Sequence, residues 1–403
     1  MTDEELAQSH AACPTTRSQS SLTINKMTDA CEKETILDWT AKQGRVLTAD
    51  GKATEFYTQE RGFPFQQDEL PHHHLMCSNT ESTFSSWATE NREKNPVCGV
   101  FSRPLFVGGF EHTTSHDEVV YNVQTNTLFI DMRIPRIGQK LLKEVKGFDD
   151  MSDEQMRMFA RRHAFAGYTR LQHEQNRPVC TRHHCIDWNF VGVPRPRPNK
   201  WFVDMQNDGS VWKELSYAKD DHGQHYYWEQ WIRYNRDGNG NGLVLALRKE
   251  KTKSDSRDGI LVVVGDHFNY ILGREMTGSE KDYGKSSTVD IIDAAIKAGD
   301  KRTAQSFLSI DAGHGLISKG WVIDCALWHW KEGSKLFDTV SVEGSDVNSL
   351  KVEINKCPWK VYECNINPDD LQRIFQWTGT GGSFPYESVV LGAIGKKRDA
   401  SSM

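Results

Sequence analysis

The chain has 403 residues, 37% of them hydrophobic and 10% aromatic, which is enough for two domains with buried cores. A net charge of -6 and a pI of about 6.2 give no basic field, which argues against nucleic acid as a partner. No apolar run approaches the roughly 20 residues that span a bilayer, and the first 30 residues lack the apolar segment of a signal peptide. Nine scattered cysteines, an odd number, favour reduced thiols. We therefore expect a cytoplasmic protein with no membrane span.

The N-terminal part of the chain is polar. Residues 1–34 are rich in Ser, Thr, Gln, Asp and Glu without apolar periodicity, so we expect a disordered tail. Residues 35–96 are expected to form a partly ordered extension. Within it, Asp50 and Gly51 make the dipeptide that type I′ turns favour, which predicts a β-hairpin.

Residues 119–135 predict two strands joined by a turn at residues 125–127. On the second strand, Asp131 and Arg133 share one face, whereas the residues of the other face are apolar. The apolar face can therefore pack against protein while the charged face meets something polar.

Residues 163–231 contain several segments with strand patterns, each ended by Gly, Pro, Asn or Asp. In the last one, Tyr227, Glu229, Trp231 and Arg233 share one face, and the other face also carries aromatic residues. Two aromatic faces, one of them charged, suit the wall of a closed barrel with an amphipathic interior. The predicted fold class is therefore mainly β.

Three segments carry helix signals. Ser152 can cap a helix that ends near Arg162, with acidic residues in its first turn. Residues 287–298 predict a second short helix, and Asn367 can cap a third that runs to Phe375.

A glycine-rich turn at residues 236–242 separates the first set of strands from a second set, so we place a domain boundary there. The expected strands of the second set include residues 242–250, 258–275, 303–312 and 319–333. We predict a first β-barrel over residues 97–238, a second β domain over residues 239–394, and a polar tail at residues 395–403.

A series of motifs runs in fixed order between residues 119 and 336: YNVQT, FIDMRIP, AFAGYT, HHCIDWNF, FVDMQNDGSVWKELS, YYWEQW, DGILVVVGD and GWVIDCALWHWKEG. In this order they resemble a poorly characterised family of cytosolic proteins from bacteria and eukaryotes, which includes the fungal casein-kinase-interacting Hri protein. The resemblance implies two lipocalin-like antiparallel β-barrels side by side, so that residues 239–394 form the second barrel. Together with the helix signals above, the expected fold has two barrels and a few short helices. It implies no established reaction and no catalytic residues.

Charged residues recur among the aromatic residues of the first predicted barrel. The carboxylates come from separate expected strands and are Asp131, Asp187, Asp204, Glu214 and Glu229. Two interpretations stay open: a network of interior ion pairs that fixes the barrel, or a polar wall that orients a ligand or moves a proton. In the second, the candidate catalytic residues are Glu229, Asp187 and His183. The candidate ligand-binding residues are Asp131, Arg133, Arg182, Asp204, Glu214, Tyr227, Trp231 and Arg233.

Histidines and cysteines crowd one expected strand, and such side chains ligate zinc or haem iron. Because neighbouring residues of a strand point to opposite faces, His183, Cys185 and Asp187 form the best ligand set. The alternative is that the histidines pack in the wall and the cysteines fill space. We expect neither a metal nor a cofactor.

These patterns predict that the chain binds a small, largely hydrophobic molecule inside the first barrel. One alternative is an enzyme that uses the same interior for acid-base isomerisation, cyclisation or elimination of a hydrophobic substrate. A second alternative is a scaffold for a protein partner. The second barrel is the poorer candidate, because the aliphatic runs of residues 242–250 and 258–275 fill a core by themselves.

Overall fold

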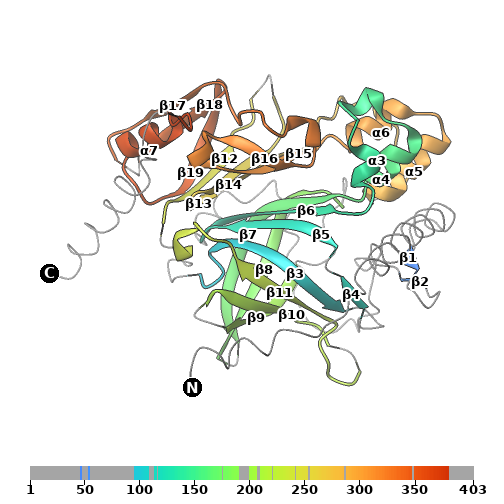
Figure 1. Cartoon of the computed structure of the whole chain (residues 1–403), viewed down its shortest axis with the longest axis horizontal. Coiled ribbons are helices and arrows are strands. Elements are labelled where there is room, and N and C mark those ends of the chain that lie inside the picture. Colours follow the sequence, from blue (N-terminus) through green and yellow to red (C-terminus); the bar gives the residue numbers. More distant parts are fainter. Residues whose placement is uncertain are drawn as a thin grey trace, which may run out of the picture. The chain divides into compact units, whose positions relative to one another are not determined.

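The computed structural model describes residues 46–47, 53–54 and 95–380, the last range without residues 109–112, 116, 175, 190–198, 207–208, 220, 241, 253–254, 286 and 347–348. Its described residues are mainly β, as the sequence predicts (Figure 1). Strand β1 (Val46–Leu47) pairs antiparallel with β2 (Ala53–Thr54), which confirms the predicted hairpin. The tails predicted at residues 1–34 and 395–403 lie outside the described residues.

A sheet of nine strands forms the first part of the fold. Its strands are β3 (Gly99–Gly108), β4 (Thr113–Ser115), β5 (Glu118–Gln124), β6 (Leu128–Pro135), β7 (His163–Glu174), β8 (Arg177–Asp187), β9 (Asn199–Gln206), β10 (Val211–Ser216) and β11 (Tyr227–Arg233). Antiparallel pairing runs from β3 through β5 to β11, and β11 pairs with β3 again, so eight strands close into a ring. We call this ring the barrel; β4 pairs with the second half of β3.

Large aromatic side chains pack inside the barrel, where alternation along each strand directs every second residue. Trp212 and Trp231 face each other in register and stack with ring centroids 5.4 Å apart. Phe101 meets Trp212 edge to face at 5.7 Å. The predicted turn between β5 and β6 is confirmed, and the hydroxyl of Thr125 accepts a hydrogen bond from the backbone N–H of Leu128 (3.0 Å).

A β-bulge interrupts the pairing of β7 with β8. Ala166 pairs with Ile186, but the next residue, Gly167, pairs with His184, so Cys185 is the extra residue. A Cβ on Gly167 would lie 1.9 Å from the backbone oxygen of His183, so only glycine allows this close approach. After the bulge, each residue of β8 points to the face opposite to the one that strict alternation from His184 would give it.

The second sheet has eight strands and follows the barrel in sequence. They are β12 (Val244–Lys249), β13 (Gly259–Val264), β14 (His267–Leu272), β15 (Asp311–Leu316), β16 (Val322–Ala326), β17 (Val340–Glu343), β18 (Lys351–Ile354) and β19 (Cys357–Cys364). Pairing runs β16-β15-β14-β13-β12-β19-β18-β17, and over the described residues the end strands do not pair with each other. A second sheet is therefore confirmed, whereas the sequence predicts a second closed barrel.

Helix α7 (Pro368–Phe375) explains why this sheet forms a core without closing. Its residues Leu371, Ile374 and Phe375 are buried in one hydrophobic cluster with the strands of the second sheet. Phe375 stacks on Trp321 with ring centroids 5.1 Å apart. As predicted, Asn367 caps the helix, since its side chain accepts a hydrogen bond from the backbone N–H of Asp370 (2.8 Å).

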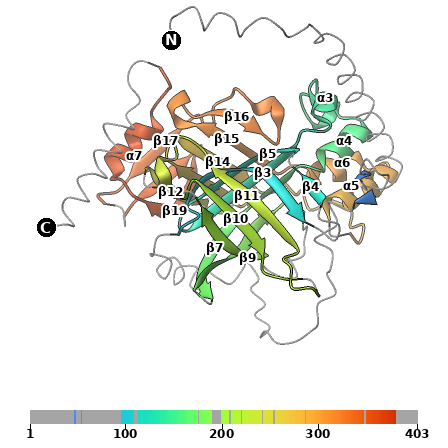
Figure 2. The same cartoon turned by 60° about the horizontal axis from the view of Figure 1, so that its bottom comes forward.

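The opposite face of the second sheet packs on the outside of the barrel, where β13 and β14 contact β5 and β6 (Figures 1 and 2). Asn269 of β14 donates hydrogen bonds to the backbone oxygens of Tyr121 (3.1 Å) and Ile130 (3.3 Å). His314 stacks on the ring of Tyr121 with centroids 3.8 Å apart. The apolar face predicted for β6 is thus covered by protein.

The remaining helices gather at one end of the second sheet (Figures 1 and 2). They are α3 (Gln139–Leu142), α4 (Asp153–Phe159), α5 (Thr288–Lys297) and α6 (Lys301–Phe307). Short 3-10 turns lie at Phe148–Asp150, Gly238–Gly240, Ile317–Lys319 and His329–Lys331. The predicted caps of α4 and α5 are confirmed, because Ser152 and Ser287 each accept from the backbone N–H three residues later (3.2 Å for both). None of the described helices has the length and apolar character needed to cross a bilayer.

Three predictions for the second sheet need correction. Residues 258–275 form two strands, because Gly265 adopts a φ of +64° in a tight turn between them. Residues 301–307 form α6, capped by Asp300, and β15 begins only at Asp311. β16 ends at Ala326, before the end of the strand predicted over residues 319–333.

Candidate functional site

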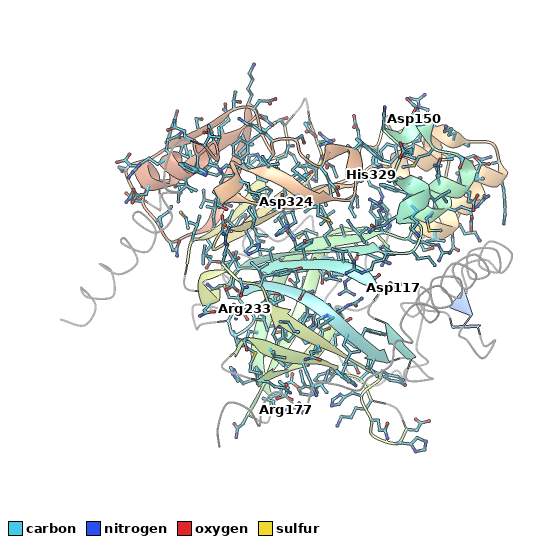
Figure 3. The ribbon with its side chains drawn as sticks, in the orientation of Figure 1. Asp117, Asp150, Arg177, Arg233, Asp324 and His329 are labelled. Carbon is cyan, nitrogen blue, oxygen red and sulfur yellow. The ribbon has the colours of Figure 1, made fainter. Side chains whose placement is uncertain are left out.

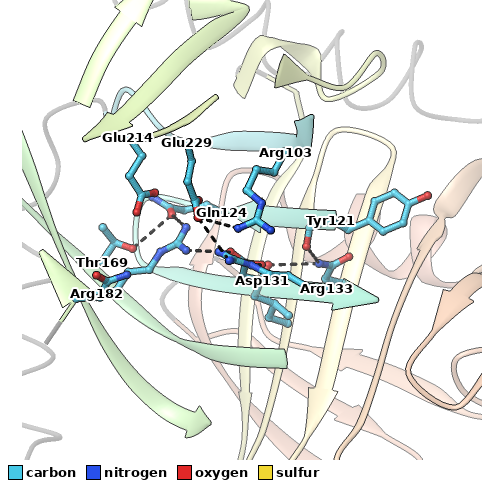
Figure 4. A network of polar contacts seen from close by, with 12 residues as sticks. Arg103, Tyr121, Gln124, Asp131, Arg133, Thr169, Arg182, Glu214 and Glu229 are labelled. Carbon is cyan, nitrogen blue, oxygen red and sulfur yellow. Dashed lines mark hydrogen bonds and ion pairs between the residues drawn. The ribbon is translucent and has the colours of Figure 1, made fainter. Parts of the chain in front are cut away.

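Charged side chains from several strands meet inside the barrel (Figure 4). Asp131 on β6 is fully buried and lies 3.0 Å from two nitrogens of Arg133 and 3.2 Å from Nη1 of Arg182. Burial, the largest influence, acts to raise the pKa of Asp131, but the two arginines outweigh it and lower that pKa. Asp131 is therefore an anion held by two cations.

Glu229 on β11 is the second anion of this network. Its Oε1 atom lies 2.7 Å from Nη1 of Arg103 and 3.6 Å from Nη1 of Arg133. Arg103 also pairs with Glu118, which extends the network to β5. Three arginines thus pair with three carboxylates, and their charges balance.

Glu214 on β10 behaves differently, although it lies directly opposite Glu229 in the register of the two strands. Its Oε1 atom accepts a hydrogen bond from the hydroxyl of Tyr227 (3.0 Å). Burial, followed by the charge of Glu229, raises the pKa of Glu214 to about 8. At neutral pH Glu214 is therefore mainly a neutral carboxylic acid beside a charge-balanced network.

Several buried polar atoms of the interior have no hydrogen-bond partner among the described residues. They include the indole nitrogens of Trp201, Trp212 and Trp231, the Oε2 atoms of Glu214 and Glu229, and both amide atoms of Asn122. All three indoles are fully buried. A buried polar group without a partner costs on the order of 1–3 kcal/mol, so a group of such atoms in one interior needs an explanation.

The arginines also cover the aromatic faces of this interior. The guanidinium carbon of Arg182 lies 5.0 Å from the ring centre of Trp201, and that of Arg133 lies 5.9 Å from the ring centre of Trp231. Cations or other rings therefore contact the faces of the indoles, whereas their N–H groups have no acceptor among the described residues.

The structure separates the predicted histidine and cysteine ligand set. Because of the bulge after His184, that histidine and Asp187 come together, with Nδ1 and Oδ2 2.7 Å apart. His183 lies on the other side of the wall, where its ring stacks on Tyr168 (4.8 Å) and burial lowers its pKa to about 4. Within the described ranges, no three His, Cys, Asp or Glu side chains are placed to hold a metal ion.

Two other predicted site residues lie apart from the network. Asp204 is exposed on β9, opposite Lys213 of β10, because Trp201 and Val203 take the inward positions of that strand. Arg233 bonds Asp237 (2.6 Å) and thus holds the loop after β11, where Figure 3 labels it. The predicted residues that do come together are Asp131, Arg133, Arg182, Glu214, Tyr227, Glu229 and Trp231.

Sequence reasoning missed Arg103, Glu118, Trp201 and Trp212. A usable signal existed for Trp212, because it precedes Glu214 by two residues and must share its face. The same alternation relates Phe101 to Arg103, but Pro104 weakens the strand pattern there.

No model of a protein family and no curated protein matches the chain. Among solved structures, the chain is similar to the crystal structure of an uncharacterized protein, YLR301w from Saccharomyces cerevisiae, with 13% sequence identity and a TM-score of 0.39. The match covers 66% of this chain and 98% of that chain.

Proposed function

We propose that the chain binds a small, largely hydrophobic molecule inside the barrel. The observation that carries this proposal is the group of buried polar atoms around Glu214 that have no hydrogen-bond partner among the described residues. A purely structural interior is expected to satisfy such atoms, as the network of Arg133 and Asp131 does. A ligand with a few polar atoms on an apolar body would satisfy them and contact the indoles.

The ion pairs alone do not account for this interior. Arg103, Arg133 and Arg182 can be explained as a structural network, because buried charges must be paired. Glu214 takes no part in that pairing, and replacing it by an apolar side chain would remove a buried polar group. Its presence therefore favours binding over a purely structural role.

The test is to identify what the full-length chain carries. The protein is purified natively and denatured, and released compounds are measured by mass spectrometry and by absorbance. We expect one compound at close to one molecule per chain, reduced at least tenfold in Glu214→Leu. Asp204→Asn, an exposed change on the same barrel, is the matched control and should carry the compound as the wild type does. Absence of any compound, together with failure to bind added small molecules, would refute the proposal.

An enzyme is the second candidate, favoured by the contact of Glu214 with Tyr227 (3.0 Å). A carboxyl group with a pKa of about 8 can donate a proton at neutral pH and take one back. Glu229, in contrast, is already paired with Arg103 and Arg133. Deuterium uptake from heavy water into a bound ketone, lost in Glu214→Gln, would support catalysis. If a bound ketone takes up no deuterium, binding without catalysis would be the function that remains.

A further inference from the structure

Glu214 is surrounded by hydrogen-bond donors. Trp212 precedes it by two residues on β10. On the neighbouring strands β11 and β9, Trp231 and Trp201 each lie two residues from the direct pairing partner of Glu214. Residues diagonal across strands have Cα atoms roughly 7–8 Å apart, which a small ligand can bridge. We call Trp201, Trp212, Glu214 and Trp231 the donor wall.

The donor wall offers donors in excess of acceptors. An indole N–H can only donate, and none of the three has a described partner. The Oε1 atom of Glu214 is taken by Tyr227, so the protonated Oε2 atom is left to donate as well. Among the described residues of the interior, the unpartnered acceptors are Oε2 of Glu229 and Oδ1 of Asn122, and the amide nitrogen of Asn122 is one more unpartnered donor.

We propose that the donor wall selects a neutral molecule whose oxygen atoms accept hydrogen bonds, such as an aromatic or alicyclic ketone or lactone. This inference rests on the proposed binding function and adds the class of ligand. Each accepted hydrogen bond would satisfy a buried donor for which the described part of the chain supplies no acceptor. The apolar body of the ligand would contact the hydrophobic cluster that contains the same indoles.

The surroundings disfavour charged ligands. A cation would be attracted to indole faces, but Arg182 and Arg133 cover the faces of Trp201 and Trp231, and Trp231 also stacks on Trp212. An anion would lie beside Glu229 and would compete for arginines that already hold carboxylates. A neutral acceptor requires no rearrangement of these pairs.

The state of Glu214 makes this binding depend on pH. The groups that act on it are Glu229 and Tyr227 from β11, Arg182 from β8 and Arg133 from β6. Burial and Glu229 raise its pKa to about 8, against the opposing effects of the arginines and the Tyr227 hydroxyl. Above that pH the carboxyl group becomes an acceptor and repels a ligand oxygen.

The experiment compares ring-matched probes on the full chain. They are 2-acetonaphthone, 2-naphthoate and 2-naphthylmethylamine, with acetophenone, benzoate and benzylamine as smaller equivalents. Dissociation constants are measured by tryptophan fluorescence and ligand-observed NMR at pH 6.5 and pH 9.5. We expect a ketone to bind at least tenfold more tightly than the matched amine and acid at pH 6.5, and at least fivefold more weakly at pH 9.5.

Substitutions in the donor wall test whether the ketone binds there. Glu214→Gln keeps a donor but cannot ionise, so ketone binding should persist and lose its dependence on pH. Trp212→Phe and Trp231→Phe should each weaken it about fivefold. Trp321→Phe is the matched control, because that indole already donates to the backbone oxygen of Ile374 in the second sheet (3.0 Å). Circular dichroism shows which variants are folded.

The outcomes separate the two proposals. Tighter binding of the amine or the acid, sensitive to Glu214 and Trp212, would overturn the ligand class and leave the binding function standing. Ketone binding that none of the barrel variants changes would place the ketone elsewhere and overturn the donor wall. Absence of binding for every probe, together with no co-purified compound, would overturn the binding function itself.

Discussion

The barrel and the second sheet fill their interiors in different ways. The core of the second sheet consists of aliphatic and aromatic side chains from its strands and from α7. Trp321 donates its indole N–H to Ile374, and one other indole of this core, that of Trp359, has no hydrogen-bond partner among the described residues. In the barrel, charged side chains pair across the interior, and Trp201, Trp212 and Trp231 donate to no described atom. A tryptophan buried only for stability is expected to have a partner for its N–H. The difference favours the barrel as the binding part of the chain.

The largest expected effect comes from breaking the ion pairs of the barrel. Arg133→Met leaves Asp131 and Glu229 each with one partner fewer, so we expect the free energy of unfolding to fall by roughly 3–5 kcal/mol. Lys319→Met is the matched control, because its pair with Asp324 is largely exposed, and it should cost less than about 1 kcal/mol. Urea denaturation followed by circular dichroism measures both. Equal effects of the two changes would contradict a network that holds the barrel interior.

Removing a buried side chain from the core of the second sheet should lower the free energy of unfolding without changing the affinity for a ligand. Ile374→Ala removes a fully buried side chain of α7, so we expect a loss of roughly 2–5 kcal/mol by the same denaturation assay. Arg373→Ala, one residue away and exposed, should change stability by no more than about 0.5 kcal/mol. Ketone affinity should stay unchanged in both variants. A folded Ile374→Ala protein with altered affinity would show that the second sheet takes part in binding.

Acid should destabilise the barrel through its buried histidines. Burial lowers the pKa of His163 and of His183 to about 4, from about 6.5 in the unfolded chain. The folded state therefore binds fewer protons, and stability is full above pH 6.5 and falls as the pH drops towards 4. Each histidine contributes a slope of about 1.4 kcal/mol per pH unit in that range.

His163→Gln removes one of these titrations, so the loss of stability between pH 6.5 and pH 4.5 should be smaller than in the wild type. The exposed His222→Gln is the control and should leave the slope unchanged. Denaturation curves across this pH range give the slope. An unchanged slope in His163→Gln would mean that this ring is protonated in the folded barrel.

Much of the fold could be predicted because local signals and burial agree. The hairpin at residues 119–135 has an apolar face on one side and Asp131 and Arg133 on the other, and alternation alone separates these two faces. The caps at Ser152, Ser287 and Asn367 are equally local, because each side chain bonds an N–H of its own first turn.

Other features depend on contacts that the sequence does not display. Asp204 alternates with Trp201 and Val203, so either face of β9 could face inward, and the packing of the indole decides which one does. The bulge after His184 is set by the close backbone approach at Gly167, and no strand pattern predicts where alternation changes. The closing helix fills the second sheet, which removes the need for a second ring of strands.

The smallest expected effect has the opposite sign and separates the two facing glutamates. The folded state holds the proton of Glu214 up to about pH 8, whereas the unfolded chain releases it near pH 4.5. This raised pKa gives stability that is full below pH 4.5 and is lost as the pH rises towards 8. Glu214→Gln removes that loss, so the variant should be more stable than the wild type at pH 8. The net gain is reduced, because Gln also weakens the hydrogen bond from the Tyr227 hydroxyl.

Glu229→Gln is the matched control, because it lies opposite Glu214 in register and differs in its partners. Loss of its charge leaves Arg103 with Glu118 alone, so we expect this variant to be less stable than the wild type at both pH 5 and pH 8. Thermal denaturation of both variants at the two pH values gives the comparison. If Glu214→Gln were destabilising at pH 8 to the same extent as Glu229→Gln, Glu214 would be an anion paired within the network. The donor wall would then contain no protonated carboxyl group.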